Sequence, residues 1–260
     1  MATLAADLRT IWQLTMGRVR GSSHAERLEN FYSPQAANYD AFRKKMHHGR
    51  DELFQMIDIP DGGTWIDLGA GTGENLERIG PRINSLKSVH LVDLSESLLD
   101  VANARCKSRG WSHVTTNFAD VTTFSRSQGT ADVVTFSYAL TMIPNWFEAI
   151  DQAMRLLKPG GVIGIVDFYI SRKFPTGGRR KHAWFIRSFW PTWFANDNVF
   201  LNSDHLPYLT SQFEMVRLLE REGSLPLIPL LKVPHYIFIG RKPINNLSNV
   251  VQNPSTSSIV

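Results

Sequence analysis

Apolar and polar positions along the central part of the chain predict strands that alternate with helices. Short apolar runs bounded by turn-forming residues predict strands at 64–68, 89–93, 114–118, 132–137, 162–169, 213–219 and 235–240. Between them, helical spacing predicts helices from Gly73 to Ile79, over 95–109 with Ser95 as its cap, and over 145–157. This order predicts an α/β fold with a seven-stranded, mostly parallel sheet, an antiparallel closing pair and helices on both faces.

The residues before this alternation predict an N-terminal helical extension over 1–58. Residues 3–16 place apolar side chains at helical spacing, which fits a helix docked on the domain or an interfacial amphipathic helix. Residues 24–58 predict two more helices, the second interrupted near His48 and Gly49. The turn at 60–63 then opens a domain over 59–242, and the Asn- and Ser-rich tail at 243–260 is predicted to be disordered.

Composition excludes several classes of protein and of site. The 260 residues carry a net charge of +4 and a sequence pI of about 9.3, which indicates only weakly an anionic partner. The single cysteine, Cys106, cannot form an internal disulfide, and no cysteine and histidine residues have zinc spacing. No apolar window is long enough for a transmembrane helix and no signal peptide is recognised, so any work on membranes is expected at their surface.

A glycine-rich turn after the first predicted strand is the strongest chemical signal. Residues 66–73 read Ile-Asp-Leu-Gly-Ala-Gly-Thr-Gly, with Asp67 two residues before Gly69, Gly71 and Gly73. Glycines permit a tight turn and a close approach of a ligand to the main chain. Dinucleotide-binding folds space their glycines as G-x-G-x-x-G, whereas Glu74 occupies the next position here. The pattern resembles that of class I S-adenosylmethionine-dependent methyltransferases, which implies their Rossmann-like fold and S-adenosylmethionine as cofactor.

The ends of the next three strands carry further candidate cofactor-binding residues. Asp93 ends the second strand, where a carboxylate can accept hydrogen bonds from both ribose hydroxyls, although it could instead cap a helix. Asp120 follows the third strand, where this fold usually contacts the adenine amine, although it could be a solvated loop acid. The cofactor-binding residues predicted at these strand ends are Asp93, Leu94, Asp120, Val121 and Ser137.

Several stretches resemble a more specific family, the N-methyltransferase component of betaine-lipid synthase, which makes diacylglyceryl-trimethylhomoserine. The resemblance covers roughly residues 24–241. The glycine motif is shared by all class I methyltransferases, whereas the Tyr-Asp, Gly-Arg-Asp and Ser-Tyr…Met-Ile-Pro stretches are much more specific. The similar stretches are 24–32, 35–36, 39–40, 49–51, 67–75, 92–94, 135–138, 142–144, 166–169, 189–190, 197–198, 223–226 and 233–236.

The resemblance and the chemistry of methyl transfer to an amine suggest roles for four more residues. By the resemblance, Arg50 would pair with the cofactor's carboxylate, because a guanidinium binds carboxylates in a fork, and Tyr39 would close over the same site. Asp167 ends the fifth strand and would orient the amine, while Tyr138 would accept a hydrogen bond from it. A surface salt bridge for Arg50 and a structural acid for Asp167 are the alternatives.

The function implied is N-methylation of diacylglyceryl-homoserine to the trimethyl betaine lipid, at the cytoplasmic face of the membrane. Alternatives are N-methylation of phosphatidylethanolamine or an ornithine lipid, or methylation of a small molecule or tRNA. No Asn/Asp-Pro-Pro-Tyr motif follows the fourth strand, which argues against adenine or glutamine N-methylation. The aminocarboxypropyl transfer that eukaryotic synthases perform in a fused domain is expected of a separate polypeptide partner.

Residues 170–196, within a predicted insertion over 170–210, contain no acid and combine basic with aromatic side chains. Such a composition suits an anionic bilayer surface; a lid packed on the core and a single-stranded nucleic-acid surface are the alternatives. We expect membrane contact and no nucleic-acid partner. The residues concerned are Arg172, Lys173, Arg179, Arg180, Lys181 and Arg187, with Trp184, Phe185, Phe189, Trp190, Trp193 and Phe194.

Overall fold

A seven-stranded sheet forms the centre of the computed structural model, which describes residues 22–32, 46–125, 128–195, 198–225 and 228–244. The strand order is β3-β2-β1-β4-β5-β7-β6, with β1 to β5 parallel and β7 antiparallel to both of its neighbours. The strands are β1 (Thr64–Leu68), β2 (Ser88–Asp93), β3 (Val114–Phe118), β4 (Ala131–Ser137), β5 (Leu157–Phe168), β6 (Glu214–Leu225) and β7 (Ile228–Arg241). The predicted seven-stranded, mostly parallel sheet is confirmed.

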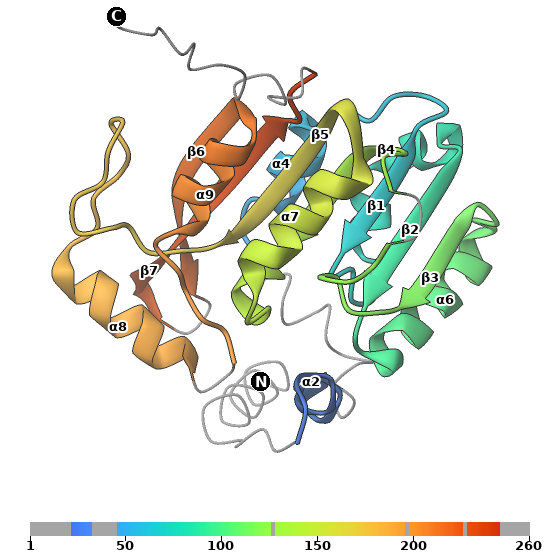
Figure 1. Cartoon of the computed structure of the whole chain (residues 1–260). Helices are drawn as coiled ribbons and strands as arrows, with labels where there is room; N and C mark the ends of the chain where they lie inside the picture. The colour runs from blue at the N-terminus through green and yellow to red at the C-terminus, as the bar shows by residue number, and fades with distance from the viewer. Residues whose placement is uncertain (1–21, 33–45, 126–127, 196–197, 226–227, 245–260) are drawn as a thin grey trace, which may run out of the picture.

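Helices cover both faces of this sheet (Figure 1). One apolar cluster joins α4, α6 and α8 to one face, and a second joins α7 and α9 to the other. Because both faces are covered, the central strands β1 and β4 are almost wholly buried, as expected of parallel sheets. The helices are α2 (His24–Tyr32), α4 (Arg50–Met56), α5 (Asn75–Arg78), α6 (Glu96–Arg109), α7 (Trp146–Leu156), α8 (Trp184–Ala195) and α9 (His205–Gln212), with short 3-10 helices η2 (Gly80–Ser85) and η3 (Leu140–Met142).

Local sequence signals account for the bounds of α6. The Ser95 hydroxyl accepts the Leu98 backbone N–H at 3.4 Å at its start, as predicted. The helix stops at Gly110, whose φ of 70° is the left-handed conformation that glycine adopts readily. The start of α6 is therefore fixed close to Asp93, the last residue of β2.

Three strands extend well beyond their predicted bounds, whereas β2 and β4 each begin only one residue earlier than predicted. β5 begins at Leu157 instead of 162, because the register shifts between Ala131 and Val133 and residues 158–161 bulge inside the strand. β6 and β7 form a long hairpin, and each is longer than predicted. The predicted helix over 3–16 lies outside the described residues, as does almost all of the predicted tail.

Helix α8 is attached to the core through one side only. Trp190 is fully buried and its indole N–H donates to the Lys232 carbonyl oxygen at 3.0 Å, while the Phe194 ring packs on Phe168 at 5.1 Å between centroids. Trp184, at the first turn, is 76% exposed. The same helix therefore holds one tryptophan that supports the fold and one that does not.

We predict that the two tryptophans differ sharply in their effect on stability. Trp190→Ala should lower the free energy of unfolding by about 3–5 kcal/mol, because it leaves a large cavity. Trp184→Ala should change it by less than about 0.5 kcal/mol, as surface substitutions usually do. Urea denaturation of both variants measures the difference, and equal losses would contradict this packing.

Candidate functional site

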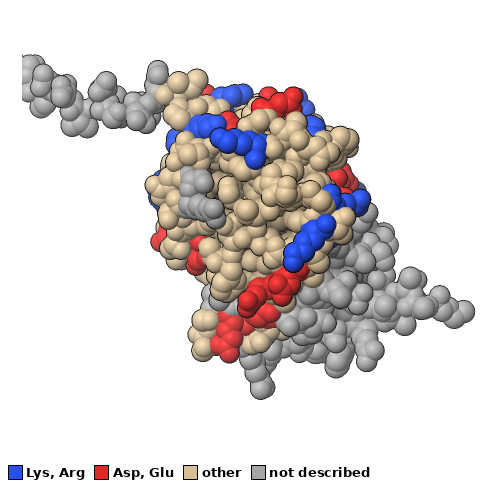
Figure 2. Space-filling view, turned by 90° about the vertical axis from the view of Figure 1, so that its right-hand side faces the viewer, with Lys and Arg blue, Asp and Glu red and all other residues tan. Residues whose placement is uncertain are grey.

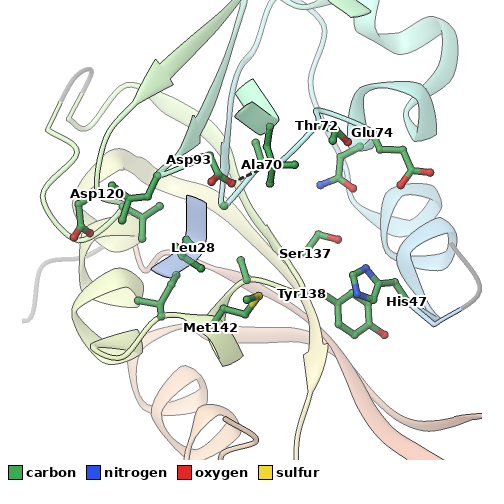
Figure 3. Close-up of a pocket in the computed structure, with 18 of the residues that line it drawn as sticks. Leu28, His47, Ala70, Thr72, Glu74, Asp93, Asp120, Ser137, Tyr138 and Met142 are labelled. Atoms are coloured by element: carbon green, nitrogen blue, oxygen red, sulfur yellow. Dashed lines mark hydrogen bonds between the residues drawn. The ribbon is translucent and has the colours of Figure 1, made fainter. Parts of the chain in front are cut away.

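A cavity of about 210 Å³ opens at the carboxyl ends of β1, β2, β3 and β4 (Figure 3). Ligands of open α/β sheets bind at this edge. Asp93 and Asp120 stand at one end of the cavity, and His47 and Tyr138 stand at the other. The residues that line it are Leu28, His47, Arg50, Gly69, Ala70, Gly71, Thr72, Glu74, Asn75, Asp93, Leu94, Leu98, Asp120, Val121, Thr122, Ser137, Tyr138, Ala139, Met142, Ile143, Pro144 and Asn145.

The glycine turn after β1 forms the wall of the cavity. Gly69 and Gly71 line it, and both have positive φ angles, of 72° and 55°. A Cβ atom on Gly69 would lie 2.5 Å from the Cβ of Ala139, so a side chain at this position would displace the neighbouring wall. Gly73, predicted with them, does not line the cavity: a Cβ on it would meet Leu91 and Ala102.

Asp67 stabilises the glycine turn from inside the core and does not line the cavity. Its fully buried carboxylate accepts hydrogen bonds from the Asn75 amide at 2.8 Å and from the Thr135 hydroxyl at 2.6 Å. Burial raises the pKa of Asp67 to about 6, although both hydrogen bonds favour the ionised form. The predicted cofactor-binding acid is thus a link between the turn, α5 and β4.

Asp93 faces the cavity from the end of β2. Its Oδ2 accepts the Gly71 N–H at 2.8 Å and its Oδ1 accepts the Ser95 N–H at 2.9 Å. Each carboxylate oxygen has a second lone pair, so these bonds orient Asp93 without using its full capacity as an acceptor. Burial raises the pKa of Asp93, and the three backbone N–H groups that donate to it counteract this. Leu94 lies beside it in the cavity wall, as predicted.

The loop after β3 closes the same end of the cavity. Asp120 and Val121 both line it, as the sequence predicts. The Asp120 Oδ1 accepts the backbone N–H and the hydroxyl of Thr122, at 2.8 and 2.7 Å. Both bonds use the same carboxylate oxygen, and they fix the loop beside the cavity.

Arg50 and Ser137 both line the cavity, and Arg50 is held in place by its neighbours. Two guanidinium nitrogens of Arg50 donate to Glu74 Oε2 at 2.7 Å and to Asn75 Oδ1 at 2.6 Å. Arg50 is only 8% exposed, so it is a buried wall residue instead of a surface salt bridge. It therefore gives this part of the cavity wall a fixed guanidinium group, which suits an anionic or polar ligand.

Tyr138 dominates the aromatic end of the cavity. It has a φ of 56°, rare for a residue with a side chain, directly after β4. Its hydroxyl donates to the His48 carbonyl oxygen at 2.6 Å, and its ring stacks on that of His47 at 4.0 Å between centroids. The Phe168 ring meets it edge-on at 4.6 Å. The strained residue is thus held by contacts from two distant segments.

Asp167, predicted to be catalytic, does not line the cavity. Its carboxylate accepts hydrogen bonds from the backbone N–H and hydroxyl of Thr141, at 3.2 and 2.7 Å, and from the Phe168 N–H at 2.8 Å. Burial raises its pKa to about 7. It therefore holds η3, whose Met142 lines the cavity, against the end of β5. Tyr39, predicted to close over the site, lies outside the described residues.

The structure adds cavity residues that the sequence did not single out as candidates. His47 lies two residues before the Gly-Arg-Asp stretch, which is a weak signal for it. Helix α2 contributes Leu28 to the lining, and its Glu29 accepts the Ser95 hydroxyl at 2.8 Å. That bond fastens α2 to the start of α6 beside the cavity.

The aromatic residues of 170–196 do not act as one group. Trp190 and Phe194 are buried, which corrects the expectation that all of them face a membrane. Phe174, Trp184 and Phe185 are 72%, 76% and 46% exposed. Within the described ranges, no helix is long and apolar enough to cross a membrane, and no three His, Cys, Asp or Glu residues form a group that could hold a metal ion.

The chain is similar to known methyltransferases in sequence and in fold. It is 26% identical over 149 residues to the ubiquinone/menaquinone biosynthesis C-methyltransferase UbiE of Hydrogenovibrio crunogenus, a stretch covering 55% of this chain and 59% of that protein. It is 25% identical over 200 residues to the protein of the same name from Pseudomonas entomophila, covering 75% and 77%. The chain spans about three fifths of the length of several curated relatives that it matches.

A solved structure shows the same fold. The N-methyltransferase NodS of Bradyrhizobium japonicum, in complex with S-adenosyl-L-homocysteine, superposes with a TM-score of 0.60 at 16% identity, covering 83% of this chain and 98% of that one. The family model described as a methyltransferase domain matches residues 39–223, which include β1 to β5 and most of the cavity. The chain therefore belongs to the methyltransferase-domain family, as an S-adenosylmethionine-dependent enzyme of class I.

Proposed function

We propose that this enzyme transfers methyl groups to the amino head group of a membrane lipid, with diacylglyceryl-homoserine as the acceptor. The observation that carries the proposal is the aromatic end of the cavity. There, the rings of Tyr138, His47 and Phe168 form a cluster, with the Tyr138 centroid 4.0 Å from that of His47 and 4.6 Å from that of Phe168. Aromatic faces attract quaternary ammonium groups, which are the product of complete N-methylation.

The residues of the cavity fit S-adenosylmethionine, which supplies an electrophilic methyl group on its sulfonium. Asp93 would accept hydrogen bonds from the ribose hydroxyls, and Asp120 would contact the adenine amine. Arg50 and Ser137, which both line the cavity, would bind the amino-acid end. Gly69 and Gly71 let the main chain approach it closely.

The strand order leaves one end of the cavity for the acceptor. Asp120, Asp93 and Gly69 follow β3, β2 and β1, which are neighbours in this order in the sheet. Ser137 and Tyr138 follow at the end of β4, the next strand. In this proposal the cofactor extends along these strand ends as far as Ser137, and the acceptor amine would lie beside Tyr138.

The residues at this end suit an amine that must lose a proton before each transfer. An alkyl ammonium has a pKa of about 10.4 and is not nucleophilic until deprotonated. His47 would accept that proton, because an imidazole is the usual general base near neutral pH. The Tyr138 oxygen donates its hydrogen to His48, so its lone pairs are available to accept a hydrogen bond from the amine.

The choice of a lipid acceptor rests on the stretches that resemble betaine-lipid synthase. Arg50 of the Gly-Arg-Asp stretch lines the cavity, and so do Ser137, Tyr138, Met142, Ile143 and Pro144 of the Ser-Tyr…Met-Ile-Pro stretch. In this proposal, a separate polypeptide transfers the aminocarboxypropyl group first. The enzyme then works on the inner face of the membrane as a peripheral protein.

Methylation of a quinone ring carbon is the second candidate. Relatives named as ubiquinone/menaquinone biosynthesis C-methyltransferases and as demethylmenaquinone methyltransferases favour it. Such an acceptor is also an amphiphile with a long apolar tail, so both candidates require access from a bilayer. They differ in charge, because only the amine becomes cationic on methylation.

Cofactor binding should depend on Asp93. Asp93→Ala should weaken S-adenosylmethionine binding by about 1–3 kcal/mol, the cost of losing charge-assisted hydrogen bonds. Calorimetry measures the loss, with Asp100→Ala, an exposed acid on α6, as the control. Unchanged affinity of the Asp93 variant would remove this residue from the site.

The acceptor should be a lipid amine. Purified enzyme with isotopically labelled S-adenosylmethionine should add three methyl groups to diacylglyceryl-homoserine in vesicles and none to a demethylated menaquinol in the same vesicles. Mass spectrometry of the extracted lipids distinguishes the two. Labelling of the quinol alone would establish the second candidate instead.

The aromatic ring of Tyr138 should matter more than its hydroxyl. Tyr138→Leu should slow transfer to a lipid amine about 3- to 30-fold, since a cation over a ring gains ~0.5–2 kcal/mol. Tyr138→Phe should lose less, because it keeps the ring and removes only the hydroxyl, with its bond to His48 and the bond proposed to the amine. Initial rates compare the two, and equal losses would assign the effect to the hydroxyl.

A further inference from the structure

We propose that the face formed by Phe174, Trp184, Phe185, Lys173 and Lys181, here called the docking face, binds an anionic lipid bilayer, and that α8 connects this face to the acceptor end of the cavity. The inference deepens the proposed function and rests on it for the identity of the acceptor. The contact between the docking face and a bilayer surface can be tested without knowing the acceptor.

Exposed apolar area is the first observation. Phe174 and Trp184 are the most exposed large apolar side chains of the described residues, and Phe185 is exposed beside Trp184, with their rings 6.5 Å apart. Grouped exposed apolar side chains on a folded domain mark an interaction surface. Aromatic rings are the apolar side chains that suit the head-group depth of a bilayer.

The charges beside the exposed Phe174 ring indicate which kind of partner this face binds. The ammonium groups of Lys173 and Lys181 lie 5.4 and 5.7 Å from the centre of the Phe174 ring, and neither forms an ion pair with a described residue. Two of the neighbouring arginines are ion-paired, Arg172 with Asp204 and Arg180 with Glu222. Two uncompensated lysines that flank exposed rings complement an anionic bilayer.

A continuous series of packed rings connects the docking face to the cavity. Phe185 and Phe189 stack on successive turns of α8, and the buried rings of Trp190 and Phe194 continue the series. Phe168 then bridges Phe194 to Tyr138. Ring centroids are 4.6–5.6 Å apart along Phe185, Phe189, Trp190, Phe194, Phe168 and Tyr138.

The segment after α8 returns to the rim of the cavity. The Phe200 N–H donates to the Thr141 carbonyl oxygen at 2.7 Å, and the next residue, Met142, lines the cavity. Phe200 is itself 54% exposed. Exposed aromatic side chains therefore occur both at the start of α8 and in the segment that borders the rim of the cavity.

The opposite end of the sheet offers a matched control surface. The face in Figure 2, which includes the side of β3 and α6, carries basic and acidic groups scattered around a largely uncharged centre. Phe118 on β3 is 62% exposed and Lys107 on α6 is exposed. Phe118→Ala/Lys107→Gln therefore removes one exposed ring and one charge from a surface with no link to α8.

Flotation with liposomes tests the docking face. Phosphatidylcholine vesicles with and without phosphatidylglycerol are mixed with the full chain, with no acceptor present, over a salt series. The parent should float with the anionic vesicles, and so should the Phe118→Ala/Lys107→Gln control. Trp184→Ala/Phe185→Ala should lower the partition coefficient at least tenfold at every salt concentration, because salt does not screen apolar burial.

The contribution of the lysines to vesicle binding should depend on salt, unlike that of the aromatic rings. Lys173→Gln/Lys181→Gln should weaken binding about tenfold at low salt and little at high salt, because the Debye length falls from ~10 Å at 0.1 M to ~3 Å at 1 M. Far-ultraviolet circular dichroism confirms that each variant is folded. A parent that ignores anionic vesicles, or an aromatic variant that floats like the parent, overturns the inference.

The test separates this inference from the proposed function. If the parent floats and the aromatic variant does not, yet diacylglyceryl-homoserine is not methylated, the docking face is upheld and the acceptor is wrong. If diacylglyceryl-homoserine in detergent is methylated but no flotation occurs, the acceptor is upheld and the docking face is wrong.

Discussion

The hydrogen bonds of the buried Asp67 carboxylate hold together the elements on which the site depends. One oxygen accepts from Thr135 on β4 and the other from Asn75 on α5, so the glycine turn between β1 and α5 is fixed at both ends. Asn75 in turn accepts from Arg50, which brings α4 to the same wall of the cavity. Burial works against this arrangement by raising the pKa of Asp67 to about 6, and the two hydrogen bonds and the nearby Arg50 charge counteract it.

The acceptor end depends on a second set of constraints around β4. Tyr138 takes a strained backbone conformation because the His48 carbonyl, the His47 ring and Phe168 all position its side chain. Asp167 holds the following segment through Thr141. Asp167, which the sequence predicts to orient the amine, therefore positions η3 and the end of β5 beside the cavity. His47 supplies a polar group next to Tyr138.

The features that could be predicted from the sequence are those that short local patterns determine, such as strand bounds and strand-end residues. β1 and β3 have the predicted bounds, because each is a short run between clear turns, and Asp93 and Asp120 line the cavity because they follow parallel strands at one edge of the sheet. The sequence predicts that residues 158–161 separate a helix from the fifth strand, because Pro159 and the two glycines look like a turn. The pairing of Leu157 with Ala131 shows instead that this segment is a bulge within β5. Asp167 also ends a strand, yet its carboxylate meets donors from η3 and not the cavity. His47 reaches the site by stacking on Tyr138, 91 positions later in the chain, and no local pattern encodes this contact.

The central claim, methylation of a lipid amine, is tested most directly in a host that lacks betaine lipids. The chain is expressed there with and without a separate aminocarboxypropyl transferase, and the lipid extract is analysed by mass spectrometry. Diacylglyceryl-trimethylhomoserine should accumulate only when both proteins are present, and diacylglyceryl-homoserine should remain when this chain is absent. Persistence of unmethylated diacylglyceryl-homoserine with both proteins expressed would contradict the account.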